Sequence, residues 1–232
     1  LLQKRFPSAR ILRADRDAFQ RKNSHFETFQ AFARGEADIL VGTQMIVKGH
    51  DFPNVTLVGV LAADLSMFSG DYLASERTFQ LLTQAAGRAG RGRKEGLAII
   101  QTYQPEHYAI TCAASQDYER FYRQERLYRK MMGYPPFGAM MVAVCEHEDE
   151  MLVMEGAMKL TEILKRNSVI VLPPTEAFRS KEKDSYRKVI YIKSKNEDEL
   201  RMCRNQAQNQ IAKDELLKQI NIQFDINPVN LY

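Results

Sequence analysis

Over the first hundred residues, short apolar runs alternate with stretches in which apolar residues recur every three or four positions. The runs indicate strands, and the periodic stretches indicate amphipathic helices. The expected strands cover 9–12, 39–41, 55–62 and 97–101, and the expected helices cover 24–35 and 75–86. The runs at 55–62 and 97–101 are apolar enough for strands buried on both faces. This alternation predicts an α/β lobe with a parallel, doubly wound sheet.

The helix expected after Ser24 carries clear local signals. Ser24 and Glu27 form a capping-box pattern at its start, and Gly35 is a typical stop at its end. Phe26, Phe29 and Phe32 fall on one face of this expected helix.

A different order of elements follows residue 105. Residues 106–132 predict one long helix, which Gly133-Tyr134-Pro135-Pro136 ends. Beyond it, strands are expected at 139–144, 169–172, 188–193 and 222–226, with helices at 149–166 and 197–219. The order β-α-β-β-α-β is the split βαβ pattern of a small α+β sandwich. We therefore expect a lobe over 1–105, a connecting helix over 106–132 and a C-terminal α+β domain over 133–232.

Composition narrows the class of protein. Of the 232 residues, 44% are hydrophobic and 27% are charged, which is typical of a soluble globular chain without a membrane-spanning run. The chain starts with Leu1 inside an expected helix, which we interpret as an excised piece of a longer protein. Cys112, Cys145 and Cys203 are odd in number and far apart, so we expect cytosolic thiols and no disulfide framework or metal site.

The charge distribution is uneven. The net charge is +4, and residues 1–105 carry all of the surplus. In the neutral C-terminal half, basic residues cluster between Arg179 and Lys195 around Tyr186. This stretch has two interpretations: a surface for DNA or a partner, with Tyr186 stacked on a base, or a solvated hairpin that protects an edge strand.

The sharpest chemical signal is the run from Gln84 to Gly92, QAAGRAGRG, which lies between an expected helix and an expected strand. Arg88 and Arg91 are three residues apart, and the neighbouring glycines let the backbone turn. Two guanidiniums in this arrangement can bind the γ-oxygens of a triphosphate, as arginine fingers do. A basic loop that merely contacts phosphate is the alternative.

About forty residues upstream, VGTQMIVKGHDFP begins at the end of an expected strand. Ligands of doubly wound sheets bind at this edge. The Thr43 hydroxyl suits a DNA phosphate, although it could instead cap a short helix, and Asp51 can accept from a ribose or an arginine. These two runs, in this order, resemble motifs V and VI of superfamily 2 helicases.

The resemblance narrows to the primosomal protein N′ family of helicases. It rests on 39–55, on SERTFQLLTQ at 75–84, on GYPPF at 133–137, on Tyr186-Arg187 and on DINP at 225–228. Pro173-Pro174 and Phe178 depart from the family's usual pattern. The resemblance implies a RecA-like second lobe of a 3′ to 5′ DNA helicase that restarts stalled replication forks.

The resemblance also implies roles for individual residues. Arg88 and Arg91 would act on ATP as catalytic residues, and Gln84, Gly49 and Asp51 would help to bind it. The residues that would bind DNA are Gly42, Thr43, Gln44, Lys48 and Arg187.

Cofactors and partners follow from the same resemblance. ATP and Mg²⁺ would be held mainly by a first lobe that this chain lacks, and the family's zinc would lie outside it. The partners would be branched and single-stranded DNA, single-strand-binding protein, and primosome and helicase-loader proteins, at cytoplasmic, nucleoid-associated forks and not at a membrane.

Parts of an ATPase are absent from the sequence. No Gly-Lys dipeptide occurs, so there is no Walker A loop, and Asp214-Glu215-Leu216-Leu217 sits in an expected polar helix as solvated surface. We therefore expect the chain alone to be inactive. The alternatives are another superfamily 2 repair helicase and a non-catalytic DNA- or partner-binding module.

Overall fold

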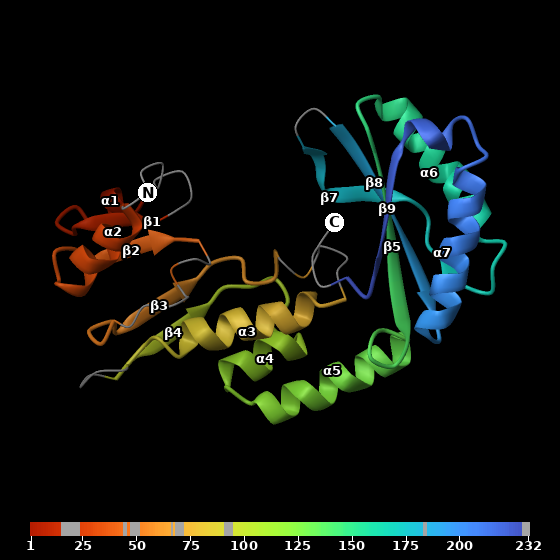
Figure 1. Cartoon of the computed structure of the whole chain (residues 1–232). Coiled ribbons are helices and arrows are strands. Elements are labelled where there is room, and N and C mark those ends of the chain that lie inside the picture. Colours follow the sequence, from red (N-terminus) through yellow and green to blue (C-terminus); the bar gives the residue numbers. More distant parts are fainter. Residues whose placement is uncertain are drawn as a thin grey trace. The chain divides into compact units, whose positions relative to one another are not determined.

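A computed structural model describes residues 1–14, 24–43, 46, 52–65, 67, 72–90, 95–182 and 185–228, without the side chains of 24, 25 and 178–182. The chain divides into two compact units (Figure 1). The first comprises Leu1–Phe68 and Ala74–Tyr122, and the second comprises Ser69–Leu73 and Arg123–Tyr232. The division at residues 105 and 133 that we inferred from the sequence stays a prediction.

In the first unit, α1 (Leu2–Arg5) precedes β1 (Ile11–Ala14), and β1 pairs in parallel with β2 (Ile39–Gly42). Between these strands lies α2 (Ser24–Ala33). Phe29 and Phe32 pack against Phe52, with ring centroids 6.3 and 5.0 Å away. Phe26 is 62% exposed and lies outside this cluster. The capping contact predicted for Ser24 lies outside the described side chains.

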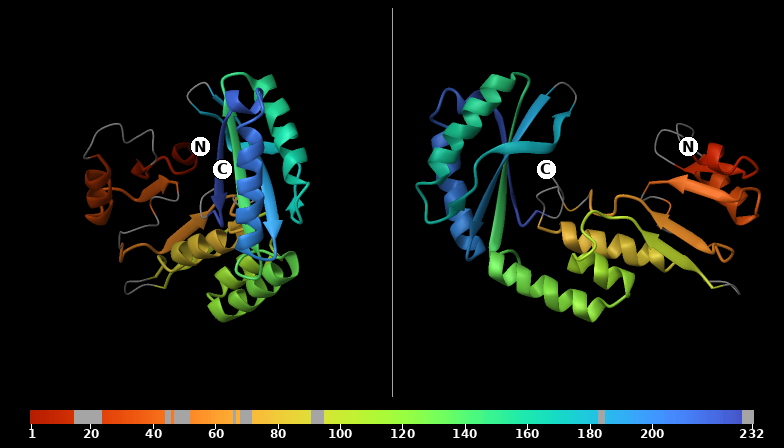
Figure 2. Two further views of the ribbon diagram at one scale, coloured as in Figure 1. Left: turned by 45° about the vertical axis from the view of Figure 1, so that its right-hand side comes forward. Right: turned by 180° about the vertical axis from the view of Figure 1, so that it is seen from behind.

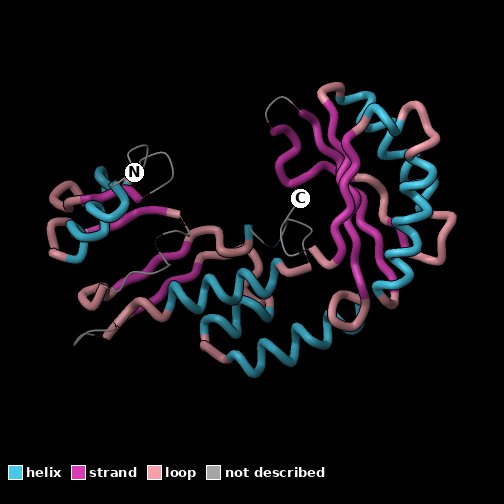
Figure 3. Tube along the Cα trace, in the orientation of Figure 1, coloured by secondary structure: helices cyan, strands magenta, loops and turns pink. Residues whose placement is uncertain are grey.

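A second parallel pair joins β3 (Leu57–Val60) to β4 (Leu97–Ile100), and α3 (Ala74–Ala86) packs on it. The helix covers the face that bears Val60 and Ile100. The opposite face is open, with Leu57, Leu97 and Ile99 each more than half exposed. Burial on both faces was therefore a wrong expectation. The parallel direction is as expected, but hydrogen bonds between the described strands form two separate pairs rather than one sheet (Figure 3).

The single helix expected over 106–132 is two helices, α4 (Tyr108–Ala114) and α5 (Tyr118–Met132). Gln116 adopts a left-handed φ of 54°, which an α-helix does not tolerate. The Asp117 carboxylate then accepts from the Arg120 amide at 2.9 Å and caps the new helix. Early in α5, Phe121 stacks on Phe79 of α3 with a centroid separation of 4.0 Å.

The second unit is a five-stranded sheet with helices on one face (Figures 1 and 2). The sheet order is β6-β8-β5-β9, and β7 also pairs with β8; all pairings are antiparallel. The strands are β5 (Ala139–His147), β6 (Ile170–Val171), β7 (Thr175–Glu182), β8 (Ser185–Ser194) and β9 (Asn221–Ile226). The helices are α6 (Glu150–Leu164) and α7 (Glu197–Ile211). The sequence did not predict β7.

The core of this unit lies between the sheet and the two helices. Its fully buried side chains include Met141, Leu160, Ile190, Leu200 and Leu217. Each helix starts at a polar cap: the Asp149 carboxylate accepts from the amides of Met151 and Leu152, and the Asn196 side chain accepts from that of Glu199.

The helix expected over 197–219 ends at Ile211, and the short 3₁₀ turn η3 (Leu217–Gln219) follows. Asp214 accepts from the amides of Leu216 and Leu217 at 3.1 Å, and Lys159 donates to it at 2.6 Å. This contact with Lys159 lowers the pKa of the Asp214 carboxyl. The acidic run is therefore a turn over the buried Leu217 and not part of an α-helix, whereas Glu215, with 87% of its side chain exposed, is solvated as expected.

Candidate functional site

The glycine-rich loop after α3 is held by close backbone contacts. Gly90 has a left-handed φ of 75°, and its amide donates to the Val55 carbonyl at 3.0 Å. A Cβ at Gly90 would lie 2.5 Å from the Gly96 amide nitrogen, and a Cβ at Gly96 would clash with Gly90 in turn. Glycine is therefore required at both positions for the backbone at Gly90 and Gly96 to approach this closely.

In the run from Gln84 to Gly92, one polar residue lies before the end of α3 and another lies after it. Gln84 is exposed on α3, and Arg88 is partly buried just after it. The Arg88 amide donates to the Ala85 carbonyl at 3.1 Å, which continues the helical turn beyond Ala86. Arg91 lies outside the described residues.

The upstream run starts at the end of β2. A Cβ at Gly42 would clash with the Ala14 carbonyl of β1 and come within 2.7 Å of the Ile46 side chain, so a residue predicted to bind DNA also serves packing. Thr43 is exposed, and its carbonyl accepts from the Ile46 amide at 3.1 Å. Within the described part of the chain, its hydroxyl makes no hydrogen bond. Gln44, Lys48, Gly49 and Asp51 lie outside the described residues.

The end of the upstream run is anchored beside the glycine-rich loop. Phe52 is buried against α2, and its carbonyl accepts from the Val55 amide at 3.1 Å. The Val55 carbonyl in turn accepts from Gly90. Backbone hydrogen bonds at Val55 therefore link the end of one predicted motif to the loop of the other.

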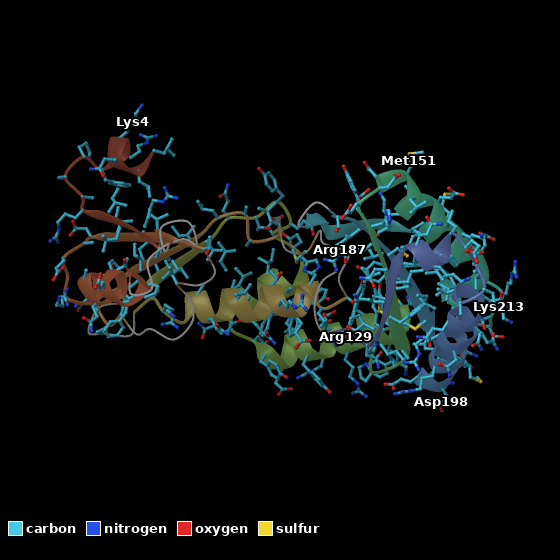
Figure 4. The ribbon with its side chains drawn as sticks, turned by 45° about the horizontal axis from the view of Figure 1, so that its top comes forward. Lys4, Arg129, Met151, Arg187, Asp198 and Lys213 are labelled. Atoms are coloured by element: carbon cyan, nitrogen blue, oxygen red, sulfur yellow. The ribbon has the colours of Figure 1, made fainter. Side chains whose placement is uncertain are left out.

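Arg187 and the basic stretch around it belong to the second unit. Arg187 lies opposite Glu146 in the β5–β8 register, and its Nε is 3.9 Å from the Glu146 carboxylate. Its side chain is 17% exposed (labelled in Figure 4). Lys188 points inward and pairs with Glu176, and Tyr186 packs against the core. Because β8 alternates its side chains between two faces, Lys188 is not part of an exposed basic surface. The choice between a surface for DNA or a partner and a solvated hairpin stays a prediction.

Asp64 is a residue that the sequence interpretation missed. It follows β3 and is 0% exposed, and one carboxylate oxygen accepts from the Tyr103 amide at 2.8 Å. The other oxygen has no hydrogen-bond partner among the described residues. An acid just beyond the carboxyl end of a parallel strand was the available signal.

The cysteines are free and buried. Burial raises the pKa of the Cys145 thiol to about 12 and that of Cys203 to about 11. The described residues contain no cluster of His, Cys, Asp or Glu that could hold a metal ion. Nor does any helix among them combine the length and apolar character needed to cross a bilayer.

Two family models match the chain. Residues 1–93 match the helicase conserved C-terminal domain, and residues 130–229 match the primosomal protein N C-terminal domain. The replication restart protein PriA of Bacillus subtilis is 42% identical over 230 residues, which are 98% of this chain and 29% of that protein. The chain belongs to the PriA family.

Other PriA proteins support the same assignment. That of Synechocystis is 41% identical over 196 residues, 83% of this chain and 24% of the relative. That of Chlamydia trachomatis is 35% identical over 237 residues, 100% of this chain and 31% of the relative. The chain thus spans less than a third of the length of these PriA proteins.

Proposed function

We propose that this chain is the second motor lobe and C-terminal domain of an ATP-dependent 3′ to 5′ DNA helicase that restarts stalled replication forks. The observation that carries this proposal is the hydrogen bond between Gly90 and Val55, which joins the glycine–arginine loop to the run that begins at Gly42. A motor needs such a connection, because ATP hydrolysis must be coupled to DNA contact.

The residues of the glycine-rich loop suit a triphosphate. A guanidinium donates paired hydrogen bonds to phosphate oxygens, and the partly buried position of Arg88, next to a loop that requires glycine at Gly90 and Gly96, supports this role. We assign the same role to Arg91, and supporting nucleotide contacts to Gln84, Gly49 and Asp51. ATP supplies the energy of translocation, and the first lobe of the full-length protein would hold its phosphates and Mg²⁺.

DNA contacts are assigned to the start of the upstream run. The exposed Thr43 with an uncommitted hydroxyl supports a phosphate contact, and we place Gly42, Gln44 and Lys48 beside it. Arg187 can bind DNA only if its guanidinium leaves the Glu146 carboxylate and contacts a DNA phosphate instead.

We class the C-terminal unit as a split βαβ sandwich, which the sheet order β6-β8-β5-β9 supports. We propose that this unit binds branched DNA, single-strand-binding protein, and primosome or helicase-loader proteins at cytoplasmic replication forks. For the isolated chain, the alternative is a non-catalytic DNA- or partner-binding module. Phosphate release by the purified chain tests this point, since turnover above a buffer blank would overturn the expected inactivity.

The decisive experiment is Arg88→Ala in the full-length protein. Losing an arginine finger should lower the ATP hydrolysis rate by about 10³-fold or more, while affinity for single-stranded DNA stays unchanged. Arg120→Ala is the control, because Arg120 is an exposed arginine of the same unit away from the loop. Near-wild-type hydrolysis by the Arg88 variant would show that this arginine is structural.

A second experiment tests Thr43. If its hydroxyl contacts DNA, Thr43→Ala should reduce the stimulation of ATP hydrolysis by single-stranded DNA without lowering the melting temperature. Thr43→Ser, which keeps the hydroxyl, should retain stimulation. Equal losses of stimulation and melting temperature in Thr43→Ala would instead indicate a capping role.

A further inference from the structure

The loops that follow β3 and β4 are joined directly beyond the two strands. The Ala63 amide donates to the Gln101 carbonyl at 2.9 Å, and the Tyr103 amide donates to the Asp64 carboxylate at 2.8 Å. Because β3 and β4 are parallel, both loops leave this pair of strands at its carboxyl edge (Figure 1). Ligands of α/β sheets bind beyond such an edge. The junction of the two loops therefore lies where a ligand is expected.

This junction keeps two features that lower the stability of the fold. Asp64 is fully buried, and its second carboxylate oxygen has no hydrogen-bond partner within the part of the chain that the structure describes. A buried acceptor without a partner is costly, because it has lost its hydrogen bonds to water and has not replaced them. Ala62 has a left-handed φ of 50°, which alanine rarely adopts. Costs of this kind concentrate at functional sites.

The junction presents three apolar side chains to solvent, which we call the Tyr103 patch. Its members Leu61, Leu65 and Tyr103 are 79%, 67% and 82% exposed. Their backbone is held in place, because the Leu65 amide donates to the Ala62 carbonyl at 3.1 Å and Asp64 accepts from the Tyr103 amide. An exposed aromatic ring on a fixed backbone binds a ligand with little loss of conformational entropy.

The surroundings of the Tyr103 patch are uncharged. Asp64 is the only charged residue over 57–65 and 97–105, and it is buried. Because a DNA phosphate requires cations, the patch does not suit the backbone of a nucleic acid. A nucleobase is instead a flat ring without charge, and it stacks on aromatic side chains. The exposed amide of Gln101 can donate to and accept from the edge of such a base.

We propose that Tyr103 stacks on a base of single-stranded DNA, and that Asp64 is a positioning residue that holds the Tyr103 backbone for this contact. The inference rests on the proposed function in DNA unwinding. It adds a contact with a base to the phosphate contact assigned to Thr43. Stacking tolerates any sequence, because every base has a π face, and a motor that moves along DNA requires this tolerance.

The first test measures the affinity of the full-length protein for an oligonucleotide of thymidines, without ATP. Tyr103→Ala should weaken binding by about fivefold to 150-fold, the range for one stacked base, and Tyr103→Phe should bind as the wild type does. Tyr122→Ala, which removes another exposed tyrosine of the first unit, is the matched control. Unchanged affinity in Tyr103→Ala, or an equal loss in Tyr103→Phe, would overturn the proposal.

An abasic oligonucleotide of the same length separates bases from phosphates, because it keeps every phosphate and offers no ring. The wild-type protein should prefer the thymidine strand, and Tyr103→Ala should lose about fivefold or more of this preference. The slope of affinity against salt concentration should be the same in both proteins, since no phosphate contact is removed. An unchanged preference or a shallower slope in Tyr103→Ala would contradict stacking.

The role of Asp64 is tested through its amide variant. Asp64→Asn keeps an oxygen for the Tyr103 amide and should retain affinity for the thymidine strand, whereas Asp64→Ala should lose it. In the Tyr103→Ala background, Asp64→Ala should cause no further loss, because both residues serve one contact. A further loss would overturn the positioning role. If Asp64→Ala does not fold, weak binding by a folded Asp64→Asn variant would overturn it instead.

The competing occupant of the Tyr103 patch is another part of the full-length protein. In that case Tyr103→Ala would lower the melting temperature without DNA and leave affinity for the thymidine strand unchanged, which would overturn the base contact. The same titration separates this inference from the proposed function. A wild-type protein that binds no single-stranded DNA would overturn both, whereas equal binding by wild type and Tyr103→Ala would overturn the base contact alone.

Discussion

The two units differ in how completely their sheets are covered. In the C-terminal unit, α6 and α7 seal one face of the sheet, and residues such as Met141, Leu160 and Leu200 have no exposed surface. In the first unit, α3 covers one face of β3 and β4, while Leu57, Leu97 and Ile99 stay exposed on the other. On the other face of the C-terminal sheet, Val142, Val144 and Val189 are also buried, whereas the first unit carries an open strand face.

The residues that stabilise the fold and the residues proposed to bind ATP and DNA lie mainly in different units. Of the residues assigned to ATP and DNA that the structure describes, all but Arg187 lie in the first unit, in or just after β2 and α3: Gly42, Thr43, Gln84 and Arg88. Binding residues concentrate on loops that a scaffold positions, because a packed core leaves no room for a ligand. Substitutions should therefore affect stability mainly in the second unit and activity mainly in the first.

The largest expected effect is on stability. Leu160→Ala removes a fully buried side chain and should cost about 2–5 kcal/mol of unfolding free energy. Leu57→Ala, on the open face of β3, should change it by less than about 0.5 kcal/mol. Urea unfolding of the two variants measures both values. Equal costs would show that the open face is covered in solution, and would remove the difference between the units.

The glycine-rich loop offers the next effect. Gly90→Ala combines a left-handed φ with a clash against Gly96, so it should cost more than the roughly 1–2 kcal/mol of the φ alone and should abolish ATP hydrolysis in the full-length protein. Gly35→Ala is the control, since Gly35 has the same φ of 75° with open space around it. If Gly90→Ala and Gly35→Ala lost the same stability, the close approach of Gly90 to Gly96 would not contribute to the stability of the fold.

A third comparison uses one glycine from each unit. A Cβ at Gly156 would clash with the tip of Ile220, so Gly156→Ala should destabilise by about 1–3 kcal/mol, as overpacked cores do. Gly59→Ala in β3 meets nothing within 4 Å and should be neutral or stabilise by up to about 1 kcal/mol. Thermal unfolding measures both, and clear destabilisation by Gly59→Ala would indicate an occupied strand face.

The smallest effect concerns an exposed ion pair of the first unit. Arg10 donates to Asp38 from its amide and its guanidinium, which lowers the pKa of this carboxyl from 3.8 to about 2. A carboxyl with a lowered pKa stabilises the fold above its unfolded pKa, and this contribution is lost as the pH falls from about 4 towards 2.

An NMR titration of Asp38 tests this expectation. In the Arg10→Gln variant the midpoint should rise towards 3.8, whereas Lys4→Gln, a nearby exposed control, should leave it unchanged. An Asp38 midpoint that does not respond to Arg10→Gln would show that the exposed pair is not formed in solution.

Local patterns in the sequence were sufficient for most elements. The apolar run before Gly42 indicated β2, the spacing of Phe79 and Leu82 indicated α3, and the motif residues indicated the family. These signals are short-range, because helix and strand periods are properties of neighbouring residues. Requirements for glycine were visible too, although the partner of each glycine was not.

Tertiary contacts decided the rest. The strand β7, the inward orientation of Lys188 and the exposure of Leu57 all depend on which distant segment supplies a partner strand, an opposite charge or a covering helix. The same holds for the contact of Gly90 with Val55 and for the hydrogen bond of Tyr103 with Asp64. Such pairings join residues far apart in the chain, and composition and periodicity describe one segment at a time. The sequence by itself therefore determined the elements and the family, and only the folded chain decided which faces are covered and which residues meet.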